Sequence, residues 1–177
     1  SITTAGGVTV LQLDCPRAVQ LTTASGTIVT SRNLTVSGYD YYGQAMSEVI
    51  ATGTTSSAVA NVAGKKAFFQ ITGITISGSL PVAITVGTTD VLGLPVRVFN
   101  VSYVASVKSN NTLAQDAGTF VAADTATATT TTGDVRGTYA PATASNGIVR
   151  TTMGILLPAI AVGPNATRVG ALGVTQA

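Results

Sequence analysis

Residues 33–53 read NLTVSGYDYYGQAMSEVIATG, and they carry the alternation of apolar and polar side chains that is typical of a β-hairpin. Leu34 and Val36 alternate with polar neighbours, and the alternation resumes at Met46. Between the two runs lie glycine and aspartate, which favour turns. The pattern predicts two antiparallel strands with a turn between them.

The predicted turn is rich in tyrosine. It holds Tyr39, Tyr41 and Tyr42, out of five tyrosines in the chain. Two interpretations stay open at this point. The rings either pack the end of a β-sandwich or form a tip that touches a partner.

The composition predicts a single aliphatic β domain. A chain of 177 residues is long enough to bury one sizeable core. Hydrophobic residues make up 45% of it but aromatic residues only 5%. Charged residues make up 9%, against about 25% in ordinary soluble domains. The mean hydropathy is +0.44. A chain with so few charges is kept soluble by Thr, Ser, Asn and Gly, or it is part of a larger assembly, and the hydropathy fits the second option.

Charge and cysteine content argue against several classes of protein. The net charge is +2 and the basic residues are scattered, so we expect no nucleic-acid binding. No apolar run approaches the ~20 residues of a membrane helix, and we expect neither membrane insertion nor a signal peptide. Cys15 is the single cysteine, which we expect to be a small buried residue rather than a reactive thiol.

The absence of histidine argues against an enzyme. Without it there is no Ser-His-Asp or Cys-His arrangement and no histidine zinc site. The seven acidic residues are isolated from one another in sequence, so none forms an evident acid/base pair. We therefore expect no catalytic residues, no metal site and no cofactor.

Two further stretches predict particular strand features. Residues 8–13 and 17–22 read as separate strands, because Asp14, Cys15 and Pro16 interrupt them. In residues 65–77 the parity of the apolar side chains changes at Gly73. A β-bulge there would return four side chains to one face, namely Phe69, Ile71, Ile74 and Ile76.

The second half of the chain changes character. Residues 96–107 are apolar on both parities, which predicts a strand covered on both faces. Residues 123–147 are rich in Thr and Ala and predict an extended segment that is mobile or ordered by a partner. Within it lie Asp134, Arg136 and Tyr139. They belong either to a strand with the two charges on one face, or to an anchor that docks on a partner or on the sandwich.

Together these patterns predict an all-β fold of eight to ten strands in one domain, residues 1–177. We expect an antiparallel β-sandwich, jelly-roll-like, with an extended loop and terminal arms. Its expected parts are an arm or edge strand (1–7), a main sandwich (8–122), an extended segment (123–147), a final core region (148–163) and a tail (164–177).

Four motifs in order carry a resemblance to a known class of proteins. They are TVSGYDYYGQAMSEVI (35–50), KKAFFQITGITIS (65–77), VGTTDVLGLPVRV (86–98) and GDVRGTYAP (133–141). In this combination the chain resembles the decoration, or cement, proteins of tailed-bacteriophage heads. The resemblance covers roughly residues 30 to 150.

The resemblance implies a structural subunit on the outside of the virion capsid. It would bridge neighbouring major capsid proteins, as a dimer or trimer, without catalytic residues of its own. From side-chain chemistry we expect the partner contacts at Tyr39, Tyr41, Tyr42, Asp134, Arg136 and Tyr139.

Two other classes stay open. One is a phage fibre, receptor-binding or carbohydrate-binding module whose turn tyrosines stack on sugars, although the chain has no Trp. The other is a secreted or viral glycoprotein, which formal sequons at Asn33, Asn100, Asn110 and Asn165 permit.

Overall fold

The computed structural model describes residues 2–5, 8–23, 32–52, 61–79, 83–110, 112–156 and 174–177. Within them the chain forms β-strands and a single 3-10 turn, η1 (Val101–Tyr103), which confirms the all-β class. The strands are β1 (Ile2–Ala5), β2 (Val8–Thr23), β3 (Asn33–Tyr39), β4 (Ala45–Ala51), β5 (Asn61–Ile76), β6 (Ile84–Gly93), β7 (Val104–Ser109), β8 (Thr119–Val121), β9 (Thr138–Ala140) and β10 (Thr151–Ile155).

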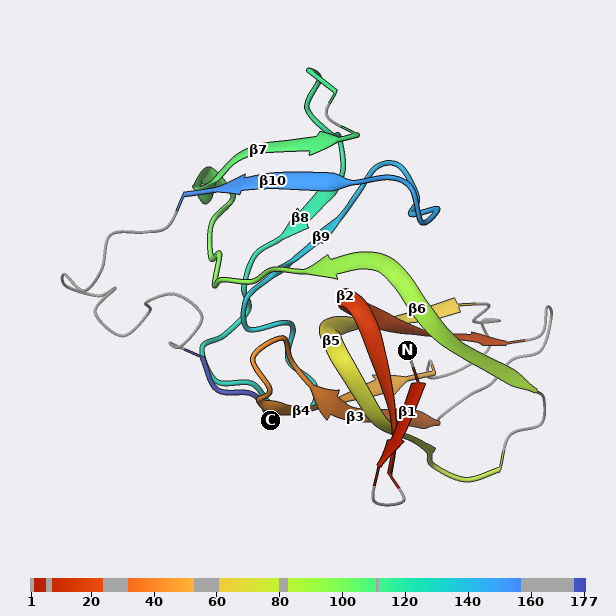
Figure 1. Cartoon of the computed structure of the whole chain (residues 1–177). Coiled ribbons are helices and arrows are strands. Elements are labelled where there is room, and N and C mark those ends of the chain that lie inside the picture. The colour runs from red at the N-terminus through yellow and green to blue at the C-terminus, as the bar shows by residue number, and fades with distance from the viewer. Residues whose placement is uncertain are drawn as a thin grey trace.

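Most of these strands belong to one curled antiparallel sheet. Its order is β4-β3-β5-β2-β6-β9-β8, and β1 pairs with β2 beside this path. The two longest strands, β2 and β5, lie next to each other in the middle (Figure 1). The predicted hairpin is confirmed, because β3 and β4 pair in register from Asn33 opposite Ala51 to Tyr39 opposite Ala45.

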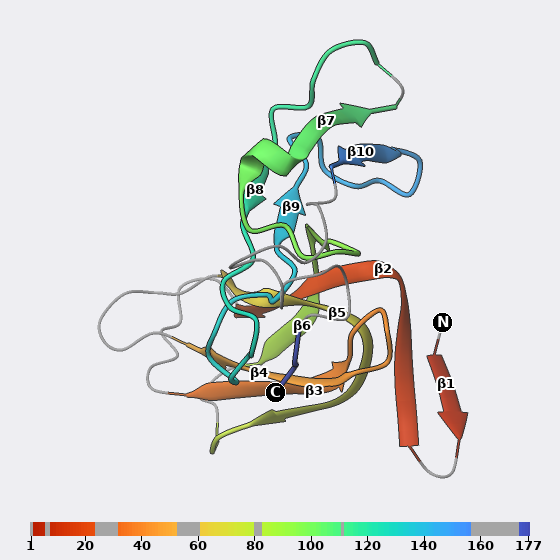
Figure 2. The ribbon, with the colours of Figure 1, turned by 90° about the vertical axis from the view of Figure 1, so that its left-hand side faces the viewer.

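The predicted break at residues 14–16 is wrong, because β2 runs through it as one strand. The sequence signal instead marks an irregularity, since the pairing of β2 with β5 shifts register between Gln12 and Arg17. Pro16 lies in the unpaired interval, where its missing N–H breaks no ladder. β2 bends sharply, and its first half extends from the body with β1 (Figure 2). Cys15 is half-buried in this interval.

The bulge predicted in β5 is present, one residue earlier than expected. Ser37 pairs with Gly73 while Gly38 pairs with Ile71, so Thr72 is the extra residue. The bulge allows Ile71 and Ile76, which differ in parity, to reach the same core. The prediction that Phe69 and Ile74 share this face with Ile71 and Ile76 is wrong, because Ile74 is exposed and Phe69 packs against Tyr41.

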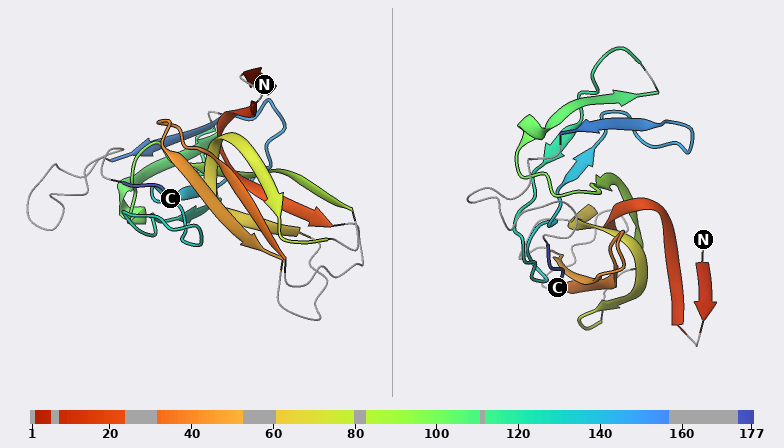
Figure 3. Two further views of the ribbon diagram at one scale, coloured as in Figure 1. Left: turned by 90° about the horizontal axis from the view of Figure 1, so that it is seen from below. Right: turned by 60° about the vertical axis from the view of Figure 1, so that its left-hand side comes forward.

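The main core lies inside the curl of the large sheet. Its buried side chains come from four strands, β2 to β5: Val19, Leu21, Leu34, Val36, Met46, Ile50, Phe68 and Ile71. The views in Figure 3 show the sheet curling around this space. Two facing halves of a curled antiparallel sheet are consistent with a sandwich, while the jelly-roll topology stays a prediction.

A second, smaller sheet pairs β7 with β10 and covers another core. Figure 1 shows it above β8 and β9. Leu94, Val98, Val107 and Tyr139 are buried there. The expectation of one strand over residues 96–107 is wrong, since only β7 forms a strand and Val98 lies in an irregular segment. The Val98 amide donates to the Arg136 carbonyl, and its own carbonyl accepts from Ala123.

Residues 122–137, here called the long loop, connect β8 to β9 and reach back to the large sheet. Within this loop Val135 is fully buried, and it packs with Ala128 and Val174. This part of the Thr/Ala-rich segment is therefore extended and packed on its own chain. Of the expected final core and tail, β10 and residues 174–177 are described, and residues 157–173 lie outside the described residues.

Candidate functional site

The tyrosine turn, residues 39–43, owes its shape to Asp40. One carboxylate oxygen of Asp40 accepts the amides of Tyr42, at 2.8 Å, and Gln44, at 2.9 Å. Gly43 adopts a φ of 77°, which favours glycine. Aspartate commonly closes turns in this way. The turn is therefore held by local hydrogen bonds from a single buried side chain.

The second carboxylate oxygen of Asp40 ties the turn to the long loop. It lies 2.8 Å from Nη1 of Arg136, and the two side chains are 2% and 4% exposed. Both charges have lost their water, so each depends on the other for compensation. This ion pair joins two of the segments that the sequence singled out.

One of the turn tyrosines, Tyr42, packs directly on this ion pair. The Tyr42 ring centroid lies 4.9 Å from Cζ of Arg136, a cation–π contact, and its hydroxyl donates to the Pro95 carbonyl at 2.7 Å. Tyr41 makes edge contacts with Tyr42 and Phe69, each with ring centroids 5.2 Å apart. Tyr39, Tyr41 and Tyr42 remain 38%, 52% and 43% exposed. The turn thus presents aromatic surface from a fixed backbone.

Asp134 fastens the long loop to β5. Its carboxylate accepts the Ala67 amide at 3.0 Å, and it also accepts the amides of Arg136 and Gly137. Burial raises the pKa of Asp134, and these hydrogen bonds oppose the rise. Asp134 and Arg136 are therefore structural groups inside the chain, which docks this stretch on its own sheet.

Tyr139 lies apart from the turn, beneath the small sheet. Its hydroxyl donates to the carboxylate of Asp116 and accepts the Gly118 amide. Burial, and then the neighbouring Asp116, raise the pKa of Tyr139 to about 12. The hydrogen bond from Tyr139 is the main cause that lowers the pKa of Asp116. The Tyr139 side chain is 3% exposed, so Tyr139 is a core residue.

Two more charged side chains are buried between β4 and β5. Nζ of Lys66 donates to the Ser47 carbonyl at 3.0 Å, and Glu48 accepts the amides of Lys65 and Lys66. Burial lowers the pKa of Lys66 and raises that of Glu48. The adjacent lysines of the sequence thus form no basic patch, because Lys66 is fully buried.

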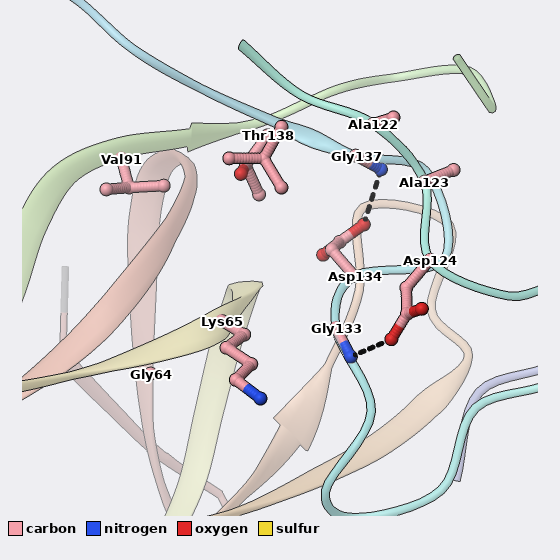
Figure 4. Close-up of a pocket in the computed structure, with 11 residues that line it drawn as sticks. Gly64, Lys65, Val91, Ala122, Ala123, Asp124, Gly133, Asp134, Gly137 and Thr138 are labelled. Carbon is pink, nitrogen blue, oxygen red and sulfur yellow. Dashed lines mark hydrogen bonds between the residues drawn. The ribbon is translucent and has the colours of Figure 1, made fainter. Parts of the chain in front are cut away.

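A cleft of about 610 Å³ lies between the long loop and the large sheet. Lys65 lies on one wall, and Asp124 and Asp134 lie across from it (Figure 4). Both carboxylates already accept backbone amides, from Gly133 and Gly137 respectively. The cleft holds a few spread charges among small side chains, and the geometry resembles no catalytic arrangement of nucleophile and base.

The structure brings together five of the six residues that the sequence singled out for contact. Tyr39, Tyr41 and Tyr42 gather in the turn, and Arg136 reaches it with Asp134 beside it on the long loop. Sequence reasoning missed Asp40 and Pro95. An aspartate between two glycines in a turn is the one signal that pointed to Asp40 as a structural residue.

Among the described residues, no three His, Cys, Asp or Glu side chains gather in a way that would hold a metal ion. The described part of the chain also has no helix long and apolar enough to span a membrane. Comparisons with protein-family models, curated proteins and solved structures found no match.

Proposed function

We propose that this protein is a structural virion protein that binds the outer surface of a bacteriophage capsid and stabilises it by bridging major capsid proteins. The observation that carries the proposal is the tyrosine turn, an exposed aromatic surface on a backbone fixed by Asp40 and Arg136. Tyrosine is enriched at the energetic centres of protein interfaces. A surface that is ordered before binding loses little entropy when it binds.

Composition and the four ordered motifs support the same proposal. A surface with few charges loses little ion hydration when it is buried on a shell. Many copies related by icosahedral symmetry add modest contacts into a large total stabilisation. The proposed role requires no metal, cofactor or catalytic group, only contact area.

The alternative of a fibre or carbohydrate-binding module draws on the same tyrosines. A sugar stacks on an open ring face. One face of Tyr42 is occupied by Arg136, and Tyr41 is flanked by two aromatic rings. These contacts favour a surface that presses on a protein over a set of rings that cradle a sugar.

The test adds the purified protein to capsids assembled without it and measures bound copies and the temperature of genome release. We expect the wild-type protein to bind and to raise that temperature. Tyr39→Ala/Tyr41→Ala should weaken binding by about tenfold or more, as for hot-spot tyrosines. Tyr42 is kept because its ring and hydroxyl hold the turn. Leu113→Ala is the matched control, an exposed apolar residue outside the turn.

Other results would refute the proposal. Absence of binding to the capsid would overturn it. Particles that lack the protein and are equally heat-resistant but fail to adsorb to cells would favour the receptor-binding module. Failure of the particles to assemble at all would indicate a shell component.

A further inference from the structure

Segment 174–177 reaches the outer edge of β4, the last strand of the large sheet on that side, at its last residue, Ala177. The amide and the hydroxyl of Ser47 both donate to the carbonyl of Ala177. Two residues further on, the Val49 amide donates to the Thr130 carbonyl at 2.8 Å. An edge strand with open amides is a template for pairing with other chains. Here segment 174–177 and the long loop occupy the edge.

The contacts of segment 174–177 are specific in both main chain and side chain. Thr175 forms a parallel bridge with Thr127, with hydrogen bonds of 2.8 Å to Ala126 and from Ala128. Val174 is buried in the small cluster with Ala128 and Val135. Gln176 donates to the same Asp40 oxygen that pairs with Arg136. We call this set of partners on β4 and the long loop the β4 edge site.

In the sequence, residues 157–173 lie between β10 and the segment that fills this site. The described body ends at Leu156, whose amide donates to Tyr103 at the small sheet. The next described residue, Val174, lies beside the long loop. Figure 1 shows β10 in the upper part of the molecule and the C-terminal residues lower down, beside β4. A connection of this length reaches up to about 60 Å when extended, at about 3.3–3.6 Å per residue.

From these observations we propose that the β4 edge site also binds segment 174–177 of a second copy of this chain. The hydrogen-bond partners and the pocket for Val174 are the same in every copy, so exchange creates no new type of contact. The reach of residues 157–173 allows the segment to enter a neighbouring site. When a segment leaves, the Ser47 amide and the edge of β4 become open, and a neighbour's segment closes them again.

The exchange links copies of the chain without requiring a capsid. It therefore goes beyond the proposed virion function and is tested on the isolated protein. Reciprocal exchange gives a dimer, and head-to-tail exchange gives a closed ring or a chain of subunits.

The test traps the exchanged segment with engineered cysteines in a full-length Cys15→Ala background. One protein carries Ser47→Cys and the other carries Ala177→Cys, with a mass tag on one of them. The two are mixed, incubated at high concentration and oxidised, and covalent heterodimers are counted by mass. We expect a heterodimer yield severalfold above that of the matched pair Ser47→Cys and Leu113→Cys, since Leu113 is exposed and outside the site.

The double variant Ser47→Cys/Ala177→Cys calibrates the geometry within one chain. Its closure into a monomeric disulfide, together with heterodimers from the mixed single variants, supports exchange. If the double variant closes but the mixed single variants give no more heterodimer than the Leu113 pair, the segment stays in its own site. This result overturns the proposal. If the double variant forms no disulfide within one chain, the segment does not lie at the β4 edge in solution. This result also overturns the proposal.

Discussion

Asp40 and Arg136 form an ion pair of 2.8 Å whose side chains are almost fully buried. It fixes the tyrosine turn from below, because Asp40 also accepts the amides of Tyr42 and Gln44. The long loop is attached at the same point, since Arg136 belongs to it. One buried pair thus sets the position of the exposed aromatic surface and of a loop that arrives from the other end of the sheet.

Removing one partner of this pair leaves a buried charge without compensation. We expect Arg136→Met to lower the free energy of unfolding by about 3–5 kcal/mol. The double variant Asp40→Asn/Arg136→Met should lose less than the sum of the two single variants. Urea unfolding of all four proteins gives the coupling free energy. Additive losses would show that the two side chains contribute independently.

Gly38 and Gly73 test whether a glycine is needed where two backbones approach closely, because only Gly38 lies against a neighbouring backbone. A Cβ on Gly38 would clash with the Gln70 carbonyl oxygen, whereas a Cβ on Gly73 would meet no atom within 4 Å. We expect Gly38→Ala to cost about 1–3 kcal/mol through overpacking. Gly73→Ala should leave stability unchanged or raise it by up to about 1 kcal/mol, because it restricts the unfolded chain. Denaturant unfolding distinguishes the two, and equal losses would contradict the packing of β3 on β5.

Glu48 should make stability depend on pH. Burial raises its pKa above the ordinary 4.5, so the folded chain holds this proton more tightly than the unfolded chain. Its contribution to stability is complete below pH 4.5 and is lost as the pH rises through the folded-state pKa. Relative to Glu48→Gln, the melting temperature of the wild type should therefore increase on acidification. A difference in melting temperature between the wild type and Glu48→Gln that does not change with pH would contradict this.

Asp14 supplies a control of opposite sign. Its hydrogen bond with Arg17 holds the pKa of Asp14 well below the ordinary 3.8. That contribution is present above pH 3.8 and is lost as the pH falls through the folded-state value. Relative to Asp14→Asn, the wild type should lose stability on acidification. The effect is small, because the Asp14 side chain is largely exposed and solvent screens the pair.

Tyr139 should be visible in a spectroscopic titration. Its pKa of about 12 predicts a late component in the tyrosinate absorbance that disappears in Tyr139→Phe. The variant should also lose about 1.5–3 kcal/mol, as expected for a hydrogen bond to a carboxylate. Tyr42→Phe is the comparison, because its hydroxyl donates to the neutral carbonyl of Pro95 and should cost only about 0.5–1.5 kcal/mol. Retention of the late component in Tyr139→Phe would contradict the assignment.

The local features of the fold could be predicted because their partners are close in sequence. The alternation in residues 33–51 determined both strands of the hairpin, and the parity change near Gly73 located the bulge to within one residue. At Pro16 the same local signal was ambiguous. A proline that interrupts a ladder marks either the end of a strand or a bend within it. In β2 it marks a bend, because β5 pairs with β2 both before Pro16, at Gln12, and after it, at Arg17.

The anchor of the candidate site could not be predicted, because its partners are distant in sequence. Nothing in the spacing of Asp40, Pro95 and Arg136 indicates that they meet. Their contact depends on how the long loop returns to the sheet, which Asp134 determines through the Ala67 amide. The prediction of a single strand over residues 96–107 was wrong for the same reason, because its partners are distant in sequence. Val98 forms backbone hydrogen bonds with the long loop rather than with a neighbouring strand, while its buried side chain packs in the same cluster as Tyr139 of β9.

The central place of β2 in the sheet has a consequence for biosynthesis. Its partners β5 and β6 follow much later in the chain, and Arg17 pairs with Phe68 on one side and Leu92 on the other. The β3–β4 hairpin can close soon after it leaves the ribosome, whereas the part of β2 beyond its pairing with β1, residues 12–23, has two open edges until β5 and β6 are made. Such non-local pairing folds slowly and exposes strands to aggregation. The yield of native protein should therefore rise with slower translation or with chaperones that shield β2 until β6 has been made.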